Sequence, residues 1–532
     1  MSNYSFFSGQ INMDSTRQSL IGEIKKRVQD RILERTNADL LIKLITNADS
    51  LDEAINIAAL GTTYKRTGLH FDKRLEKMGN AIRYFKKNEK LSFRTDDAKP
   101  VNKLIIGDNY QALQNLLIQY RGKIDVIYID PPYGKDSMGE FAKTNYNNAI
   151  TRDNLLSMLY PRLVLARQLL SDGGVIFCSI DDKNQAYVKC LFDEIFGETN
   201  FAGIFPWRKR TAKSDVPFGI SQDYEYILVF AKSEFFKASI EGGNRKYFET
   251  PDFPNRPWRF HDMTTQRTSL ERPNSNFTII NPKNNETYPV NPQAVWRITK
   301  EGFPEYLKEN RIIFPDDYDF LKISKPVLRY WKDEDEKKAK DDFGKIAVST
   351  KLPDYVGMSQ DGTKEISNIL GEKSFGYPKS VKLINFLIKI SSNQNSIILD
   401  FFAGSGTTGH AVLDLNKSDG GNRIFILCQL NEKTDANPDG IAYDVTSKRL
   451  KRIMTGECYD GSKDFPWLQD NEPYGGNLDV YEIEEIFNSE STEGKTPFDV
   501  IDETLYGKEK FQTVKEKIEW VCQNFDKTQT KL

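Results

Sequence analysis

Four consecutive residues at the end of an apolar stretch have the side chains and spacing to hold a flat amine. Residues 124–130 read I-D-V-I-Y-I-D, and Pro131, Pro132 and Tyr133 follow. The lone pair of an exocyclic base amine is delocalised into the ring, so the amine becomes nucleophilic only when hydrogen bonds draw its hydrogens out of plane. Asp130 and the Pro131 carbonyl are the expected acceptors, because consecutive prolines fix φ and offer no competing N–H. Tyr133 supplies a ring on which a base can stack.

The alternative is that the two prolines merely end a buried strand. The position of the motif favours the functional interpretation, because α/β sheets bind ligands at the carboxyl ends of their strands.

A glycine-rich turn after a second apolar stretch is the other candidate site. Residues 396–402 read S-I-I-L-D-F-F, and a G-x-G-x-x-G pattern begins at Gly404. Glycines without side chains let such a turn pass close to a bound nucleoside. A dinucleotide-binding fold would close the next strand with an acidic residue for the ribose. Here that strand, 423–428, is closed by Gln429, with Glu432 shortly after. A cofactor with a ribose and no pyrophosphate fits at least as well.

Together these motifs resemble the S-adenosylmethionine-dependent DNA amino-methyltransferases. The D-P-P-Y element precedes the F-x-G-x-G element, as in the circularly permuted β group of that family. Asp130 resembles the N6-adenine form, since N4-cytosine enzymes generally carry Ser there. The resemblance implies that Asp130, Pro131, Pro132 and Tyr133 are catalytic and that S-adenosylmethionine is the cofactor. An N4-cytosine or RNA methyltransferase remains an alternative, as does an NAD-type oxidoreductase that uses the glycine turn.

Other stretches resemble further motifs of this family. Residues 103–109, K-L-I-I-G-D-N, look like the strand and acidic turn beside the cofactor's adenosine. Residues 375–380, F-G-Y-P-K-S, look like the element whose lysine reaches the cofactor carboxylate. No metal site is expected. The residues that the resemblance assigns to the cofactor are Asp108, Asn109, Phe375, Lys379, Asp400, Phe402, Gly404, Ser405, Gly406, Thr407, Thr408, Gln429 and Glu432.

The flanking sequences resemble one subgroup, the modification subunits of type III restriction-modification systems. Residues 59–74 precede the core, and residues 493–507 follow it, as in that subgroup. Gly134 and Lys135 depart from the pattern, since these relatives often carry Asn after the tyrosine. The resemblance implies double-stranded DNA as substrate, base flipping, a homodimer and a separate ATP-dependent restriction subunit. The chain itself has no G-x-x-x-x-G-K-[ST] loop for ATP. An orphan methyltransferase without a restriction partner is the alternative.

The composition is that of a reduced, cytoplasmic protein. The chain has 532 residues and five cysteines without C-x-x-C spacing, so neither a disulfide framework nor a zinc site is expected. It contains no signal peptide and no 18-residue apolar run, so no membrane association is expected.

The formal net charge is only −2, but basic and acidic residues are segregated along the chain. Residues 470–503 hold eleven acidic side chains against Lys495. Residues 207–213 are basic and begin with an aromatic ring, which predicts a loop that follows DNA phosphates and stacks on a base. The alternative is an ordinary solvated face. The expected DNA-binding residues are Trp207, Arg208, Lys209, Arg210 and Lys213.

The order of patterns along the chain predicts an α/β fold. Apolar strands are expected at 103–107, 124–130, 174–180, 224–230, 396–402 and 423–428, with helices between them. By resemblance this is the S-adenosylmethionine-dependent methyltransferase fold, a mostly parallel, doubly wound and circularly permuted sheet. The expected divisions are a helical N-terminal region (1–95), the first half of the core (96–235), an inserted target-recognition domain (236–370), the second half of the core (371–460), and a small C-terminal domain (461–532). The last of these could pack on the core or form a dimer or partner contact. The N-terminal helices are equally compatible with a DNA clamp and a docking surface.

Overall fold

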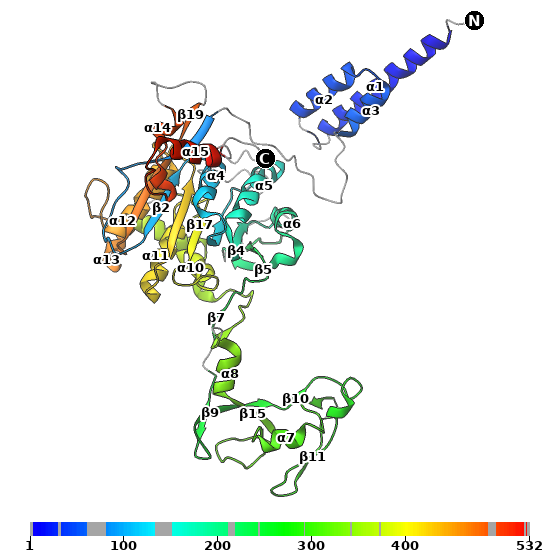
Figure 1. Ribbon diagram of the computed structural model, residues 1–532, viewed down its shortest axis with the longest axis vertical. Coiled ribbons are helices and arrows are strands. Elements are labelled where there is room, and N and C mark those ends of the chain that lie inside the picture. Colours follow the sequence, from blue (N-terminus) through cyan, green and yellow to red (C-terminus); the bar gives the residue numbers. More distant parts are fainter. Residues whose placement is uncertain are drawn as a thin grey trace. The chain divides into compact units, whose positions relative to one another are not determined.

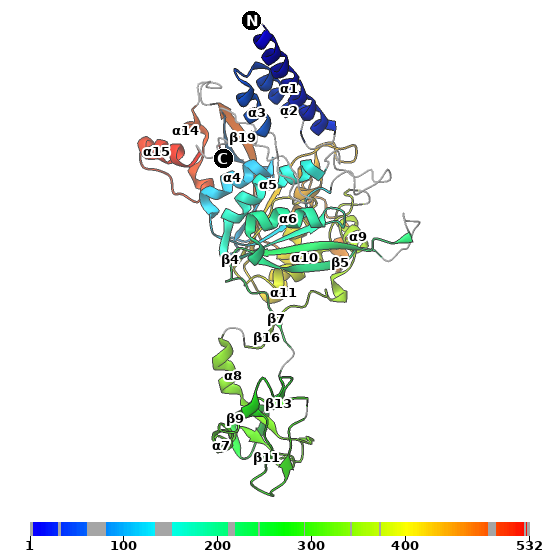
Figure 2. The ribbon, with the colours of Figure 1, turned by 90° about the vertical axis from the view of Figure 1, so that its right-hand side faces the viewer.

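The structure is a computed structural model in which the chain forms two compact units (Figures 1 and 2). The first unit comprises Met1–Ala238 and Ser349–Leu532, and the second comprises Ser239–Val348. The residues that the structure describes are 4–29, 33, 35–60, 81–133, 152–210, 219–242, 245–291, 293–340, 343–371, 374–487, 496–525 and 528. Gly134, Lys135, Lys213 and most of the 59–74 motif therefore lie outside the described residues.

A nine-stranded sheet forms the centre of the first unit within the described part of the chain. Its inner strands are parallel, because β19, β2, β18, β17, β3 and β4 pair in that order in one direction. Strands buried on both faces need almost continuous apolar sequence, which these segments have. In spatial order the strands are β1 (Ala81–Lys87), β19 (Asn477–Phe487), β2 (Val101–Ile106), β18 (Ile424–Gln429), β17 (Ile397–Asp400), β3 (Ile124–Ile129), β4 (Leu170–Ile180), β6 (Tyr224–Ala231) and β5 (Phe201–Arg208). All six predicted strands are confirmed.

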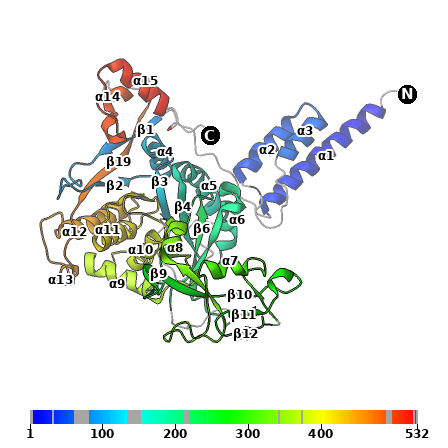
Figure 3. The ribbon, with the colours of Figure 1, turned by 60° about the horizontal axis from the view of Figure 1, so that its bottom comes forward.

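Helices cover both faces of this sheet, as Figure 3 shows. One layer consists of α4 (Asn109–Tyr120), α5 (Arg152–Leu169) and α6 (Gln185–Phe196). The other contains α10 (Val381–Lys389), α11 (Thr407–Asp419) and α12 (Lys448–Thr455). The predicted doubly wound α/β fold is confirmed. Because β3 leads into the first layer and β17 into the second, the strand order switches direction between them, where such folds bind ligands.

At one edge of the central sheet, the structure adds strands to two of the predicted divisions, and packing on the core was one of the two alternatives predicted for 461–532. Strand β1 lies within residues 1–95, the region predicted to be helical. Strand β19 lies within residues 461–532, the predicted C-terminal domain. These strands pair antiparallel with each other, and β19 also pairs with β2. Both segments therefore extend the central sheet. The physical reason is the apolar content of β19, which buries Leu478, Val480 and Tyr481 among others.

The chain after β19 packs back onto this edge through Tyr506. The segment contains α14 (Pro497–Val500), η9 (Glu503–Tyr506) and α15 (Val514–Phe525). The Tyr506 ring stacks on Phe85 at 5.4 Å between centroids. Its buried hydroxyl accepts a hydrogen bond from the Phe85 N–H at 2.8 Å and donates to Asn115 Oδ1 at 2.8 Å. One side chain thus connects the end of the chain to β1 and α4.

Three helices form the N-terminal segment: α1 (Tyr4–Gln29), α2 (Arg35–Asn47) and α3 (Leu51–Leu60). Their shared core contains Ile24, Ala38, Ile45 and Ala54. Among the described residues, no helix combines the length and hydropathy needed to cross a bilayer.

The second unit is a small β structure. Its main sheet has the order β14 (Ile312–Ile313), β15 (Val327–Trp331), β9 (Phe253–Asp262) and β8 (Phe248–Thr250). Short pairs join β7 (Ile240–Glu241) to β16 (Lys345–Ile346), β10 (Thr264–Thr265) to β13 (Val295–Trp296), and β11 (Ile279–Ile280) to β12 (Thr287–Tyr288). Two helices, α7 (Phe303–Lys308) and α8 (Lys332–Ala339), complete it.

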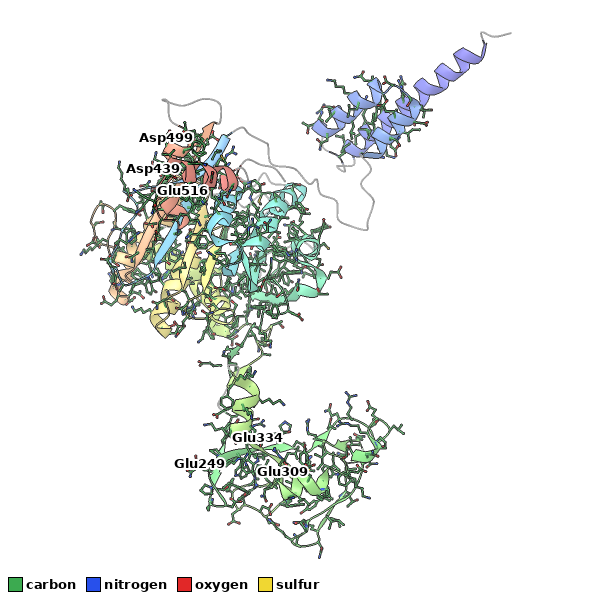
Figure 4. All side chains as sticks on the ribbon, viewed as in Figure 1. Glu249, Glu309, Glu334, Asp439, Asp499 and Glu516 are labelled. Carbon is green, nitrogen blue, oxygen red and sulfur yellow. The ribbon has the colours of Figure 1, made fainter. Side chains whose placement is uncertain are left out.

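An ion pair between Arg311 and Glu334 attaches α8 to this unit. Glu334 of α8 receives two hydrogen bonds from Arg311, at 2.8 and 2.9 Å, and Arg311 also donates to Glu309 at 2.5 Å. Figure 4 labels both glutamates among the side chains of this unit.

The C-terminal limit of the predicted insert, 236–370, is wrong. The compact unit ends at Val348, and α9 (Ser359–Leu370) belongs to the first unit. The reason is the apolar face of α9, whose Ile366 clusters with Phe375, Ile441 and Val445.

We expect Tyr506→Phe to destabilise the first unit by about 2–4 kcal/mol, because it leaves the Phe85 N–H and Asn115 Oδ1 buried without this partner. Chemical denaturation followed by circular dichroism measures the change. Val514→Ala, at a side chain that is 73% exposed, is the control and should unfold like the wild type. Equal stability of Tyr506→Phe and wild type would contradict the anchoring role.

Candidate active site at the carboxyl ends of β17 and β3

The two sequence motifs meet because their strands are neighbours. Strands β17 and β3 pair in parallel, with Leu399 opposite Ile127. Asp400 is the last residue of β17, and Asp130 directly follows β3. Parallel strands end at the same edge of a sheet, so the glycine turn and the D-P-P-Y motif share one site.

Asp130 is held by a lysine from a distant part of the chain. The Lys379 ammonium donates to both Asp130 oxygens at 2.8 Å and lies 3.2 Å from Tyr133 Oη. The Tyr133 hydroxyl donates to Asp130 Oδ1 at 3.1 Å. Lys379, expected at the cofactor carboxylate, therefore contacts the D-P-P-Y motif instead. Its cofactor role stays a prediction.

A second carboxylate, Glu225 of β6, completes this cluster. Its Oε2 lies 3.4 Å from Lys379 Nζ and 3.3 Å from Tyr133 Oη, so Glu225 and Asp130 share the single hydroxyl hydrogen of Tyr133. Its Oε1 accepts from Lys209 Nζ at 3.4 Å. The charges alternate along Asp130, Lys379, Glu225 and Lys209. Sequence analysis missed Glu225, because an acid at the start of an apolar strand looks like an ordinary exposed residue.

The environment sets the protonation of these groups. Burial raises the pKa of Asp130 above its ordinary value, although the Lys379 charge opposes that shift. Burial alone would also raise the pKa of Glu225, but Lys379 and Lys209 together hold it below its ordinary value. Burial would lower the pKa of Lys379, and the charges of Asp130 and Glu225 raise it instead. Lys379 and Glu225 are therefore both charged near neutral pH.

The two Asp130 oxygens are not equivalent. Oδ1 accepts from both Lys379 and Tyr133, whereas among the described residues Oδ2 accepts from Lys379 alone. A carboxylate oxygen has two lone-pair directions. Oδ2 can therefore accept one further hydrogen bond, and the Asp130 side chain is 27% exposed on this site.

The glycine turn between β17 and α11 is braced from both sides. Gly404 and Gly406 have left-handed φ values of 51° and 78°, which favour glycine. The Gly404 N–H donates to Gln429 Oε1 at 2.6 Å, and the Thr446 hydroxyl donates to the Gly404 carbonyl at 2.6 Å. A Cβ on Gly406 would lie 3.3 Å from the Thr446 methyl. These contacts fix the turn in a backbone conformation that favours glycine, so no side chain at positions 404 and 406 covers the backbone.

A fully buried arginine supports the same turn from beneath. Arg449 of α12 donates to the Ser405 and Thr407 hydroxyls, both at 3.0 Å. Its other terminal nitrogen lies 3.1 Å from His410 Nδ1. Burial and the Arg449 charge hold the pKa of His410 well below its usual value, so His410 accepts this hydrogen bond as a neutral ring. Sequence analysis missed Arg449. Its position beside Leu450, on a helix with an apolar side, could have indicated that this arginine is buried.

Asp400 ties the strand to the helix across the turn. Its Oδ1 accepts from the Phe402 N–H at 2.9 Å and its Oδ2 from the Thr408 hydroxyl at 2.6 Å. Burial raises the pKa of Asp400 to about 7, with a smaller contribution from Asp130. Asp400 therefore stabilises the glycine turn, in addition to the cofactor role predicted for it.

The other predicted cofactor residues line the same edge of the sheet. Asp108 caps α4 through the Tyr110 N–H at 2.8 Å and accepts from Arg162 at 3.0 Å. Asn109 donates to the Phe401 carbonyl at 2.7 Å. Phe375 is buried, whereas Phe402 is partly buried beside the core. The cofactor roles of these residues stay predictions.

Two buried acceptors after β18 have no hydrogen-bond partner among the described residues. They are Asn431 Oδ1 and Glu432 Oε2, and burial raises the pKa of Glu432. Unpaired buried acceptors are costly, so a ligand that brings hydroxyl donors fits here. These two acceptors suit the hydroxyl donors of a ribose in a nucleoside cofactor.

The predicted DNA-binding loop needs one correction. The Trp207 ring is buried, with 1% of the residue exposed, and its Nε1 donates to the Gly357 carbonyl at 2.8 Å. It therefore cannot stack on a base as predicted, because the alternation of β5 points it into the core. Lys209 faces Glu225, Arg208 is exposed, Arg210 is partly buried, and Lys213 lies outside the described residues.

Comparison with known families matches most of the core. A family described as DNA methylase matches residues 124–435. Residues 13–126 match a family described as uncharacterised conserved protein UCP028340.

Three curated relatives are each 31% identical to the chain. The StyLTI Mod subunit, a type III restriction-modification enzyme of Salmonella typhimurium, aligns with 63% of this chain and 53% of its own length. The type III EcoPI Mod subunit of Escherichia phage P1 aligns with 66% and 62%. The type II methyltransferase M.KpnI of Klebsiella pneumoniae aligns with 68% and 88%. The chain thus spans between half and two thirds of the length of these type III relatives.

Solved structures give weaker likenesses. The cytosine-N4-specific PvuII DNA methyltransferase is 13% identical with a TM-score of 0.31, covering 68% of this chain and 95% of its own. The M1.HpyAVI–SAM complex is 16% identical with a TM-score of 0.27, covering 62% and 92%.

We expect the stability of the chain to fall as pH rises through about 7, because the raised pKa of Asp400 favours the protonated form in the folded state. This contribution is complete below the ordinary carboxyl pKa and is lost above the folded one. Asp400→Asn should flatten the fall between pH 5 and pH 8 by about 1–3 kcal/mol. Denaturant unfolding at several pH values measures it. Asp97→Asn, an exposed carboxyl, should keep the wild-type slope, and a wild-type slope in Asp400→Asn would refute the assignment.

Proposed function

Because the chain belongs to the DNA methylase family, we propose that it transfers a methyl group from S-adenosylmethionine to the N6 amine of adenine at a specific site in double-stranded DNA. One observation supports the proposal: Asp130 directly follows the strand beside the glycine turn, and its Oδ2 accepts from Lys379 alone within the part of the chain that the structure describes. A carboxylate suited to bind an amine and a glycine turn suited to bind a nucleoside therefore lie at one edge of the sheet.

The residues of the D-P-P-Y motif bind and orient the base. The adenine leaves the duplex by base flipping, which costs a few kcal/mol. Its amine donates one hydrogen bond to Asp130 and one to the Pro131 carbonyl, while the ring stacks on Tyr133. Held in this way, the amine would keep its lone pair available for attack, and S-adenosylmethionine, when bound, would supply a sulfonium methyl with a good leaving group. Most of the rate enhancement comes from proximity and orientation.

The glycine turn and the residues around it bind the cofactor. The bare backbone at Gly404 and Gly406 accommodates the nucleoside, and Arg449 and Gln429 keep that backbone in place. Asn431 and Glu432 offer the unpaired acceptors that ribose hydroxyls need.

Adenine is preferred to cytosine because the motif begins with an acid. By resemblance, the N4-cytosine enzymes generally carry Ser at the position of Asp130. N4-cytosine methylation is the alternative within the same site. The unit Ser239–Val348 is the proposed target-recognition domain, and exposed Arg208 is a proposed phosphate contact.

We further propose that the chain is the modification subunit of a type III restriction-modification system. Two relatives of that name, StyLTI Mod and EcoPI Mod, support it, as do the flanking motifs. The proposed assembly is a homodimer of this chain with an ATP-dependent restriction subunit in the cytoplasm. The M.KpnI likeness favours the alternative, a methyltransferase that acts apart from a restriction subunit.

We expect the purified chain to methylate unmodified bacterial DNA at adenine within one short motif, and Asp130→Ala to lower the rate by a factor of about 100 or more, since an aligned acceptor is lost. Sequencing that separates N6-methyladenine from N4-methylcytosine is the measurement. Asp97→Ala, at an exposed carboxyl, is the control. Wild-type methylation by a folded, cofactor-binding Asp130→Ala protein would refute the assignment, and N4-methylcytosine would establish the alternative.

Purification of the tagged chain from its native host tests the assembly. We expect a stoichiometric ATPase to copurify and the pair, but not the chain alone, to cleave unmodified DNA with ATP. Sedimentation of the isolated chain should give a dimer. An active methyltransferase that is repeatedly isolated without a companion would support the orphan alternative.

A further inference from the structure

Glu225 belongs to none of the motifs that point to methyl transfer, yet it contacts three groups of the site. Its Oε2 lies 3.4 Å from Lys379 Nζ and 3.3 Å from Tyr133 Oη, and its Oε1 lies 3.4 Å from Lys209 Nζ. Its side chain is only 13% exposed. Burying a carboxylate is costly unless charged and hydrogen-bonding partners compensate, so the site must supply these partners.

The position of Lys379 depends on two carboxylates. An ammonium group has three donors, and Lys379 directs them at the two Asp130 oxygens and Tyr133 Oη. Glu225 Oε2 lies 3.4 Å from the same ammonium as a second ion-pair partner. The Trp207 ring lies 5.9 Å from the ammonium and the Tyr133 ring 5.3 Å. With Glu225 present, the ammonium is shared between two acids. Without it, Asp130 would be the remaining carboxylate among the described residues within ion-pair distance of this ammonium.

We propose that Glu225 is a positioning residue for methyl transfer. With Lys209 it fixes Lys379, which bridges both Asp130 oxygens, and Tyr133, which contacts Oδ1, so that the second lone pair of Oδ2 stays open to the substrate amine. This inference rests on the proposed function. In this proposal Glu225 is not assigned a contact with the base or the cofactor. It acts through Lys379 and Tyr133, both of which also contact Asp130.

The charge of Glu225 also sets how readily Asp130 accepts hydrogen bonds. The Lys379 charge lowers the pKa of Asp130, whereas the Glu225 charge raises it. Glu225 thereby offsets part of the Lys379 charge and keeps Asp130 a stronger acceptor. The titratable and charged groups that face this cluster come from each neighbouring element: Tyr128, Tyr133, Cys178, Asp181, Lys209, Lys379 and Asp400.

The test compares Glu225→Gln with wild type in single-turnover methylation of unmodified DNA at saturating S-adenosylmethionine, across pH. Glutamine keeps the shape and removes the charge. We expect the rate on the alkaline plateau to fall about tenfold, equivalent to ~1.4 kcal/mol of barrier. The acid limb should move to lower pH, because the pKa of Asp130 falls. Cofactor affinity, measured by calorimetry, should stay within about twofold of wild type, because Glu225 lies beside the D-P-P-Y motif that is proposed to bind the substrate base.

Lys209→Met is the matched variant, and it is expected to shift the pKa of Asp130 in the opposite direction. It leaves Glu225 with Lys379 as its partner and less of its charge compensated, so the pKa of Asp130 rises and the acid limb moves to higher pH. Glu225→Asp should recover part of the lost rate. Glu485→Gln, which removes an exposed charge from β19 beside Arg83, should leave the rate and profile unchanged.

Three outcomes would overturn the proposal. One is a wild-type rate and pH profile in Glu225→Gln. Another is a loss of cofactor affinity equal to the loss of rate, which would assign Glu225 a general structural role. If Glu225→Gln does not fold, an unshifted profile in Lys209→Met decides against the proposal. Absence of methylation by the wild-type chain, in contrast, would refute the proposed function and not this inference alone.

Discussion

The parallel pairing of β17 with β3 is the constraint on which the site depends. It places the end of the glycine-turn strand beside the end of the D-P-P-Y strand, although these segments lie far apart in the sequence. Every other feature of the site is built onto this edge: Asp400 spans the turn, Gln429 reaches in from β18, and Lys379 enters before α10. Strand order thus accounts for a site that neither motif forms by itself.

Sequence patterns predicted the strands well because these depend on local composition. Apolar runs such as Ile124–Ile129 are readable without knowledge of their partners, since strands buried on both faces need continuous apolar residues. The edge of the sheet was harder, because β1 and β19 are half-polar strands whose pairing joins the two ends of the chain. Periodicity within one segment carries no information about such a distant partner.

The candidate site was predicted where backbone chemistry is visible in sequence and missed where side chains from afar complete it. The prolines after Asp130 and the glycines from Gly404 onward can be recognised in the sequence, because both residue types restrict or extend the backbone conformation locally. Glu225 and Arg449 act through contacts made only in the folded chain. Trp207 shows the reverse error: an aromatic among basic residues suggests stacking, but alternation along β5 buries its ring.

The alternating charges around Asp130 are better explained by function than by stability. Replacing a buried ion pair with apolar residues is often neutral or stabilising, so such a cluster is a poor way to strengthen a fold. A carboxylate that must accept a hydrogen bond from a neutral amine, however, has to stay ionised where burial raises its pKa. A lysine beside it maintains the charge but competes for its lone pairs. A second acid that shares the lysine resolves this conflict, and Glu225 occupies that position, with Lys209 compensating its own charge.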